Sequence, residues 1–389
     1  MTHSIDQIPK VAAHSPWGHN LTLLEVQPMA GSSSRFIAPR GKRSCPVSGN
    51  GKGCMSSNSE TLWSIQYLRA LAAFGVIVFH SLSGTGNDFE FGAIGIHLFF
   101  VISGFLMWTT TCRTDVNIGR FVESRMKRIV PIYWIATLLT LTLNSLFPGY
   151  FYQATSDPAH VITSILFIPH SGVEGGIYPV LYQGWTLQYE MFFYAIFAFS
   201  LAFGMPKRLW ILTAIIGSLS LFGMIYPQFS NPVIATYTDP ICMEFLAGAW
   251  AAKLCSGRNV SPWIAGTILV TGMAGLWLGY RYEDHFGFVS WLVTASAASS
   301  IIAGAVLLER QGRIPRLVWL KFGGEASYSL YIFQVFGFFA ASRFTESWPV
   351  LPRAATLCLL AVAAGLGMFT FVEKPIQRGL KSWKQASRS

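Results

Sequence analysis

Long apolar stretches recur along most of the chain and constrain its fold more than any other feature. The first, residues 62–81, contains the segment WSIQYLRALAAFGVIVFH and is long enough to cross a bilayer, which takes about 20 apolar residues. Only 12% of the 389 residues are charged, against about 25% in soluble domains. Because a segment inside a bilayer must satisfy its own backbone hydrogen bonds, the sequence predicts an all-α, polytopic transmembrane helical bundle.

Ten of the apolar stretches are long enough to be membrane spans. They cover residues 62–81, 92–111, 129–147, 185–204, 208–226, 237–255, 261–280, 286–308, 326–342 and 353–372. Residues 160–169 form an apolar stretch that is too short to cross, so we expect it to be re-entrant or interfacial. Nearly all Lys and Arg residues fall in alternate connections and in the terminal segments. The positive-inside rule therefore predicts ten spans with both termini cytoplasmic.

The two ends of the chain differ from its apolar part. Residues 1–60 are rich in Gly, Ser and Pro, which predicts a disordered tail, and Met55 is a candidate translation start. We expect residues 61–375 to form the membrane domain and residues 376–389 to form a basic cytoplasmic tail. The net charge of +10 follows this topology, so it does not indicate binding to nucleic acid.

Two ionisable residues share one face of the first predicted span. Arg69 and His80 are eleven positions apart, which is about three helical turns plus 20°, and about 16 Å along the axis. An arginine in a span is costly unless it faces a partner or water, so it indicates a functional position. The alternative is that Arg69 snorkels to lipid headgroups while His80 lies in the interface. Further ionisable residues in or beside the spans are His97, Glu190, Asp239, Glu244 and Glu325.

Several soluble-enzyme signatures are absent from the sequence. It has no G-x-S-x-G elbow, no P-loop, no H-E-x-x-H and no dinucleotide fingerprint, and its Cys and His spacing predicts no metal site. A transporter or flippase of lipid-linked sugars is an alternative function, but the internal repeats that would support it are absent. A structural membrane protein is a third, and it leaves Arg69 and Glu190 unexplained.

Six sequence blocks between about Leu62 and Lys384 resemble the acyltransferase-3 family of integral membrane acyltransferases. The first span matches an arginine–ten residues–histidine signature at Arg69 and His80, and the second matches a G-x-x-x-F-F-V-I-S-G-F block at Gly95 and Phe99–Phe105, which includes Ser103. An R-x-x-R-I-x-P-x-Y-W block is matched at Arg125, Arg128, Pro131, Tyr133 and Trp134, and a W-[ST]-L-x-x-E-x-x-F-Y block at Trp185, Glu190, Phe193 and Tyr194. The S-Y-S-x-Y block is matched at Ser327, Tyr328 and Tyr331, and the E-x-P block at Glu373 and Pro375. The IQYLRALAA start and the ICMEFLAGAW segment, with Glu244, are most similar to the branch that O-acetylates succinoglycan-type exopolysaccharides. Two positions depart from the family pattern: His97 stands where an acidic residue is frequent, and Gln334 where a histidine is common.

The resemblance implies an O-acyltransferase of the bacterial inner membrane, embedded in lipid and without a bound cofactor. It implies transfer of an acetyl or other short acyl group from cytoplasmic acyl-CoA, most often acetyl-CoA, to a hydroxyl of a surface polysaccharide or its lipid-linked precursor. We expect His80 to act as general base or to accept the acyl group transiently, with Glu190 orienting its imidazole. Arg69, Arg125 and Arg128 would bind the phosphates of the donor. The supporting residues are Ser103, Tyr133, Trp185, Glu244, Ser327 and Tyr328. The long loop 148–184 is a candidate for a lid or for the segment that binds the carbohydrate acceptor.

Overall fold

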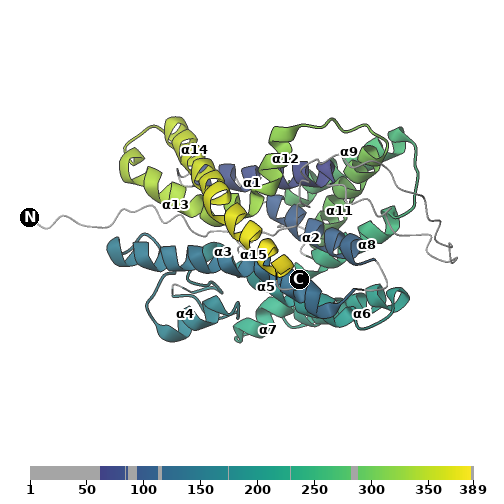
Figure 1. The fold of residues 1–389 in the computed structure, drawn as a ribbon, viewed down its shortest axis with the longest axis horizontal. Coiled ribbons are helices and arrows are strands. Elements are labelled where there is room, and N and C mark those ends of the chain that lie inside the picture. The colour runs from purple at the N-terminus through teal and green to yellow at the C-terminus, as the bar shows by residue number, and fades with distance from the viewer. Residues whose placement is uncertain are drawn as a thin grey trace, which may run out of the picture.

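The computed structural model describes residues 62–386, except 84, 86–93, 113–115, 174, 228 and 282–287. The predicted tail 1–60 and the start at Met55 lie outside these residues. The described residues form helices and turns without any strand (Figure 1). The elements are α1 (Trp63–Ser83), α2 (Ile94–Thr111), α3 (Ile118–Leu146), α4 (Pro158–Ile165), η2 (Tyr182–Gly184), α5 (Trp185–Ser200), α6 (Met205–Ile225), α7 (Pro232–Tyr237), α8 (Cys242–Cys255), α9 (Pro262–Arg281), α11 (Phe288–Arg310), α12 (Val318–Glu325), α13 (Ser327–Thr345), α14 (Val350–Met368), η3 (Phe369–Glu373) and α15 (Lys374–Ala386).

Seven described helices are long and apolar enough to cross a membrane: α1, α2, α3, α6, α9, α11 and α14, the last continuing to Leu380. Three of the predicted spans are not among them. Helices α5 and α8 have 16 and 14 residues, fewer than the roughly 20 that a span needs, and α13 has 19 residues that include several hydroxyl and amide side chains. The helical membrane bundle is therefore confirmed, while the number of ten spans and the cytoplasmic termini stay predictions.

Helix α3 begins eleven residues before the predicted span 129–147. The sequence indicated a basic loop here, and that prediction is wrong, because Arg120, Arg125 and Arg128 all lie within the helix. The Asn117 side chain caps the helix by accepting a hydrogen bond from the backbone N–H of Arg120. An ion pair between Lys127 and Glu123, one turn apart and 2.6 Å long, supports the same segment.

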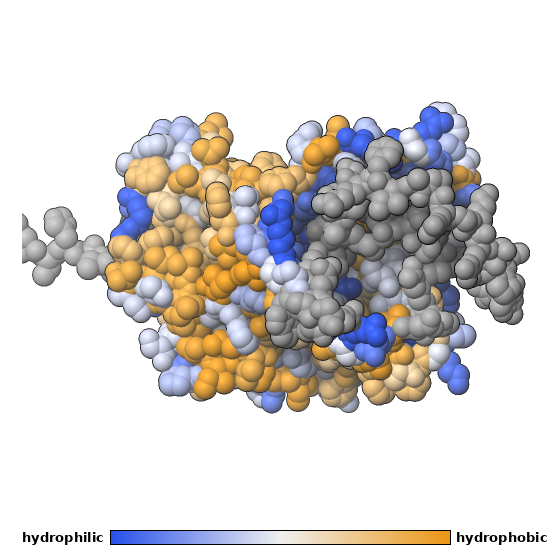
Figure 2. All heavy atoms as spheres, in the orientation of Figure 1, coloured by the Kyte–Doolittle hydropathy of each residue, from blue (hydrophilic) through white to orange (hydrophobic). Residues whose placement is uncertain are grey.

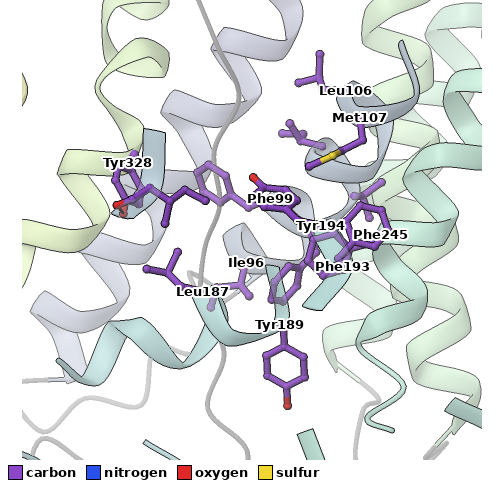
Figure 3. Close-up of a cluster of buried hydrophobic side chains, with 14 of the residues drawn as sticks. Ile96, Phe99, Leu106, Met107, Leu187, Tyr189, Phe193, Tyr194, Phe245 and Tyr328 are labelled. Carbon is purple, nitrogen blue, oxygen red and sulfur yellow. Dashed lines mark hydrogen bonds between the residues drawn. The ribbon is translucent and has the colours of Figure 1, made fainter. Parts of the chain in front are cut away.

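Glycines let several helices approach one another closely. A Cβ atom at Gly104 of α2 would overlap the backbone oxygen of Phe245, and one at Gly248 of α8 would overlap that of Val101. Small residues at such positions let the backbones of membrane helices come into contact. Aromatic side chains fill the space beside this contact: the rings of Phe193 and Phe245 stack with centroids 4.4 Å apart (Figure 3).

The outer surface of the bundle is largely apolar. Figure 2 shows apolar residues gathered over the side where α3, α13 and α14 lie. Leu138 of α3, Trp210 of α6, Val270 of α9 and Leu359 of α14 are each at least 60% exposed. Such a large exposed apolar surface is unfavourable in water and favourable in lipid, which agrees with a membrane-embedded bundle.

Polar contacts hold the ends of three helices together. The Glu309 carboxylate accepts hydrogen bonds from the backbone N–H groups of Trp63 at 2.6 Å and Ser64 at 2.9 Å, so the end of α11 caps the start of α1. Next to it, Arg310 donates to the backbone oxygen of Cys255, the last residue of α8, at 2.5 Å. The start of α1 and the ends of α8 and α11 therefore lie together, as the predicted alternation of spans requires.

Candidate functional site

Arg69 faces the interior of the bundle. Its side chain is fully buried, and its Nε and Nη2 atoms donate hydrogen bonds to Ser327 Oγ of α13 at 3.2 and 2.7 Å. Its Nη1 atom donates to Gln66 Oε1, one turn earlier on α1, at 3.3 Å. This geometry excludes the alternative in which Arg69 snorkels to lipid headgroups.

His80 lies at the other end of the same helix face. Its partly buried imidazole contacts the ring of Phe338 on α13, with centroids 6.3 Å apart, and the ring of its neighbour Phe79 at 4.8 Å. Within the residues that the structure describes, this imidazole makes no hydrogen bond. Arg69 contacts Ser327, and His80 contacts Phe338. Arg69 and His80 are eleven positions apart on α1, and Ser327 and Phe338 are eleven positions apart on α13. Helices α1 and α13 therefore run parallel and in register, and we call the contact bounded by these four residues the α1–α13 seam.

The first turn of α13 joins three other elements through three consecutive residues. Ser327 accepts from Arg69 of α1, and the Tyr328 hydroxyl donates to the backbone oxygen of Ile129 on α3 at 3.0 Å. Ser329 donates to Glu373 Oε2 at 2.5 Å. Glu373 is 1% exposed and lies in η3, a π-helical turn, a distortion that is frequent at functional sites. The S-Y-S block thus brings Arg69 and the arginine-bearing part of α3 to one end of the seam.

Arg125 and Arg128 are buried in α3, at 5% and 4% exposure. The Arg125 guanidinium lies over the rings of Phe121 and Tyr194, at 5.3 and 5.8 Å from their centroids, and donates to Thr110 Oγ1 at 3.4 Å. Arg128 follows Arg125 by three positions, so the two guanidinium groups leave the same side of α3. They therefore belong to a polar cluster inside the bundle, where a negative charge is strongly stabilised.

Glu190 belongs to this arginine cluster. Its fully buried carboxylate accepts hydrogen bonds from the Tyr194 hydroxyl and, at 3.4 Å, from Ser103 Oγ of α2. No hydrogen bond joins Glu190 to His80 among the described residues, so the predicted contact that would orient the imidazole is not formed here. The physical reason is that Tyr194, one turn further along α5, and Ser103 of α2 donate to the carboxylate locally.

The contact between an imidazole and a carboxylate is made by His97 and Glu244. His97 Nδ1 lies 2.5 Å from Glu244 Oε1, and the two side chains join α2 to α8 at 8% and 1% exposure. The His97 ring also meets the ring of Trp291 on α11, with centroids 5.8 Å apart. The position that departs from the family pattern is therefore paired with an acidic residue of another helix.

Tyr133 and Trp185 hold the segment between α3 and α5. The Tyr133 hydroxyl donates to the backbone oxygen of Ser164 in α4 at 3.2 Å, and its ring packs on Phe167. Trp185 is 3% exposed and contacts the ring of Tyr189, centroids 5.8 Å apart. Tyr133 therefore supports the loop 148–184, while Trp185 directly follows it as the first residue of α5.

Sequence reasoning missed three partners of the predicted site. Two of them could have been found from helical spacing, because residues three or four positions apart are neighbours on a helix. Gln66 lies three residues before Arg69, and Tyr194 lies four residues after Glu190. Phe338 carried no such signal, because its contact with His80 depends on the register between α1 and α13. In the described part of the chain, no three His, Cys, Asp or Glu side chains gather as a metal site.

Comparisons with known proteins agree with this architecture. Residues 62–372 match the profile of a family described as an acyltransferase domain. The chain is 33% identical over 311 residues to the exopolysaccharide production protein ExoZ of Rhizobium meliloti (strain 1021), which covers 78% of this chain and 95% of that protein. It is 23% identical over 378 residues to the O-acetyltransferase OatA of Staphylococcus aureus (strain NCTC 8325 / PS 47), covering 83% of this chain and 60% of that protein. No solved structure matches the chain significantly. The matched region contains α1, α13 and every predicted site residue, and the chain therefore belongs to the acyltransferase-3 family and is a membrane O-acyltransferase.

Proposed function

We propose that this enzyme transfers an acetyl or other short acyl group from cytoplasmic acyl-CoA to a hydroxyl of an exopolysaccharide or its lipid-linked precursor, in the bacterial inner membrane. The observation that carries the proposal is the α1–α13 seam, because it holds a buried guanidinium at one end and an imidazole at the other. By helix rise the two groups are about 16 Å apart, which is of the order of an extended pantetheine arm. Similarity to an exopolysaccharide production protein and to an O-acetyltransferase supports the acceptor and the reaction.

The anionic end of acyl-CoA would bind at the start of the seam. Arg69 lies there against Ser327, and Tyr328 ties the same helical turn to α3 next to Arg128. The first turn of α13 lies there too, and the positive end of a helix dipole favours a phosphate. Guanidinium groups bind phosphates through charge-assisted and often bidentate hydrogen bonds.

His80 would act as general base at the other end. Its imidazole takes the proton of the acceptor hydroxyl as the hydroxyl oxygen attacks the thioester carbonyl carbon and forms a C–O bond. Collapse of the tetrahedral intermediate breaks the C–S bond, and the imidazolium returns the proton to the departing thiolate. The products are the ester of the sugar and free CoA, with His80 neutral again. The described residues leave its imidazole without a hydrogen bond, so no protein donor has to be displaced from the basic nitrogen.

The loop 148–184 offers aromatic faces for a sugar. The rings of Tyr178 and Tyr182 lie with centroids 4.7 Å apart, and those of Tyr152 and Tyr182 are 5.8 Å apart. Tyr182 and Gln183 precede α5 directly, and the Tyr331 hydroxyl of α13 donates to the Gln183 backbone oxygen at 3.1 Å. The loop is therefore attached to the seam helix between Ser327 and Phe338, which suits an acceptor that approaches His80.

Radiolabelled acetyl-CoA tests the proposal. Inverted inner-membrane vesicles that contain the wild-type enzyme are expected to move the label into polysaccharide or its lipid-linked precursor, whereas vesicles with sealed, right-side-out orientation are not. Vesicles with the His80→Ala variant serve as the control for other acetyltransferases. Absence of labelled carbohydrate from wild-type inverted vesicles, or equal labelling from the outside, would overturn the proposed donor or its side.

A further inference from the structure

Gln334 is a buried amide whose carbonyl oxygen lacks a partner. The residue lies in the middle of α13 and is fully buried. Its Nε2 atom donates to the backbone oxygen of Tyr331 at 3.0 Å, but its Oε1 atom has no hydrogen-bond partner in the described part of the chain. An unsatisfied acceptor at this depth costs free energy, so its presence in a folded protein requires an explanation.

The position of Gln334 places it inside the α1–α13 seam. It follows Ser327 by seven residues, which is about 10 Å and leaves it only about 20° away around the helix. It precedes Phe338 by four residues, one helical turn or about 6 Å. Gln334 therefore shares the α13 face that meets Arg69 at one end and His80 at the other, and it lies nearer to the imidazole.

The chemistry of the pantetheine arm matches this amide. The arm is mostly aliphatic, but it carries secondary amides whose N–H groups need an acceptor once they leave water. The amide nearest the sulfur is separated from it by only two methylene groups, so a thioester at His80 brings this N–H close to the level of Gln334. We infer that Gln334 Oε1 accepts a hydrogen bond from that N–H and so holds the thioester at His80. This inference rests on the proposed acyl-CoA donor.

The register of the seam favours the donor over the carbohydrate acceptor as the ligand of Gln334. The residue lies between the guanidinium and the imidazole, which is the stretch that the arm of a phosphate-bound donor would occupy. The acceptor is expected at the loop 148–184, whose Tyr150 packs on Phe339 at the His80 end of the seam. Gln334 is therefore a donor-binding residue, and its loss should change the KM for acyl-CoA and not that for the carbohydrate.

Gln334→Met tests this assignment, because it keeps the length and burial of the side chain and removes both the carbonyl and the amide. We expect the KM for acetyl-CoA to rise about tenfold, the effect of one neutral hydrogen bond, with an unchanged KM for the acceptor. Gln188→Met is a matched control. Gln188 is 1% exposed, its Nε2 atom donates to the backbone oxygen of Ile168, and its Oε1 atom is likewise without a partner, but it lies on α5. This control should leave the KM for acetyl-CoA unchanged.

A donor analogue makes the test specific. Acetyl-CoA in which the amide nearest the sulfur is replaced by an ester lacks the proposed N–H group. The wild-type enzyme should use this analogue with a KM about tenfold higher, whereas Gln334→Met should show no additional loss, because the two changes remove the same hydrogen bond. Additive losses, or a changed KM for the acceptor alone, would overturn the inference.

Two further outcomes separate this inference from the proposed function. If the wild-type enzyme does not use acetyl-CoA, the proposed donor fails before any variant is compared. If the wild-type enzyme uses it and Gln334→Met has the wild-type KM, only the inference fails. Gln334→Asn, which retracts the amide by one methylene group, should reproduce the higher KM if Gln334→Met does not fold. Failure of both variants to fold would show that the amide is structural and would also overturn the inference.

Discussion

Two histidines in neighbouring helices of the bundle make opposite contacts. His80 of α1 is held between the rings of Phe79 and Phe338, and the described residues offer it no carboxylate. His97 of α2 is held by Glu244 of α8 at 2.5 Å, with both groups at least 90% buried. The helix that carries His97 lies against the α1 helix, since Gly95 packs on the backbone of Ala72.

This difference indicates a division of tasks. A buried carboxylate fixes the orientation of an imidazole and the position of its proton, so His97 and Glu244 act as a cross-link between α2 and α8. An imidazole without such a partner can exchange a proton with a hydroxyl that arrives beside it. The sequence reasoning assigned a carboxylate to His80, and the structure gives one to His97 instead. This division of tasks would be wrong if His97, the histidine paired with Glu244, proved to be the catalytic base.

The largest expected effect is the loss of acetyl transfer in His80→Ala. A positioned general base contributes about 10²- to 10⁴-fold to the rate, so kcat should fall by that factor. The melting temperature should change little, because the imidazole makes no hydrogen bond within the described residues. Single-turnover transfer of labelled acetyl and thermal unfolding of the purified protein check the two parts.

The same two measurements on a His97→Asn variant test whether the other histidine is the base. A wild-type rate in His80→Ala together with a rate loss in folded His97→Asn would transfer the catalytic role to the paired histidine. It would also remove the seam as the basis of the proposed function.

The next largest effect concerns stability at the other histidine. His97→Leu leaves the Glu244 carboxylate buried without its imidazole, and breaking a buried pair in this way costs about 3–5 kcal/mol. The melting temperature should therefore fall, while the rate per folded molecule is retained. Adding Glu244→Met should recover most of the loss, because replacing both charged partners by apolar side chains is often neutral. A double variant that unfolds as easily as His97→Leu would contradict the cross-link.

Arg69→Gln is expected to affect the donor end of the seam. A hydrogen bond to a charged group contributes about 1.5–3 kcal/mol, so the KM for acetyl-CoA should rise by about 10- to 100-fold with a smaller change in kcat. Arg69→Lys keeps the charge but loses the fork that reaches Ser327 through two nitrogen atoms, so it should recover only part of the affinity. An unchanged KM for the donor in Arg69→Gln would assign the residue to the fold and not to the ligand.

The residues whose orientation follows from a single helix were predictable from the sequence. The three-turn spacing of Arg69 and His80 places them on one face, and the first span was predicted at 62–81 against Trp63–Ser83 observed. Contacts between helices were not predictable in the same way. Glu190 was predicted to orient His80, but among the described residues its carboxylate accepts from Tyr194 of its own helix. The register that brings Phe338 to His80 depends on how α1 and α13 pack. The start of α3 was missed because its charges indicated a loop, although capping and an ion pair favour a helix there.

The smallest expected effect is a pH response of a third pair of histidines, His160 and His170, in the loop 148–184. Their rings meet edge to face at 4.4 Å, and His170 Nε2 lies 3.4 Å from Ser164 Oγ. Burial lowers the pKa of both imidazoles, and the charge of His170 lowers the pKa of His160 further, while hydrogen bonds to backbone oxygens and Asp157 oppose part of this. The folded loop therefore favours the neutral forms. Its stability is complete above the unfolded pKa of about 6.5 and is lost as the pH falls below it.

Hydrogen exchange of the segment 158–172 should consequently accelerate a few-fold between pH 7.5 and 5.5, after correction for the intrinsic pH dependence, whereas α1 should be unaffected. His170→Gln removes one of the two titrating groups and should reduce this response, because His160 then has no like charge beside it. His97→Asn serves as the control, since His97 lies on another helix, in contact with Glu244. A loop whose protection does not depend on pH would mean that its hydrogen bonds, such as that from Val180 to Ser164, outweigh the two imidazoles.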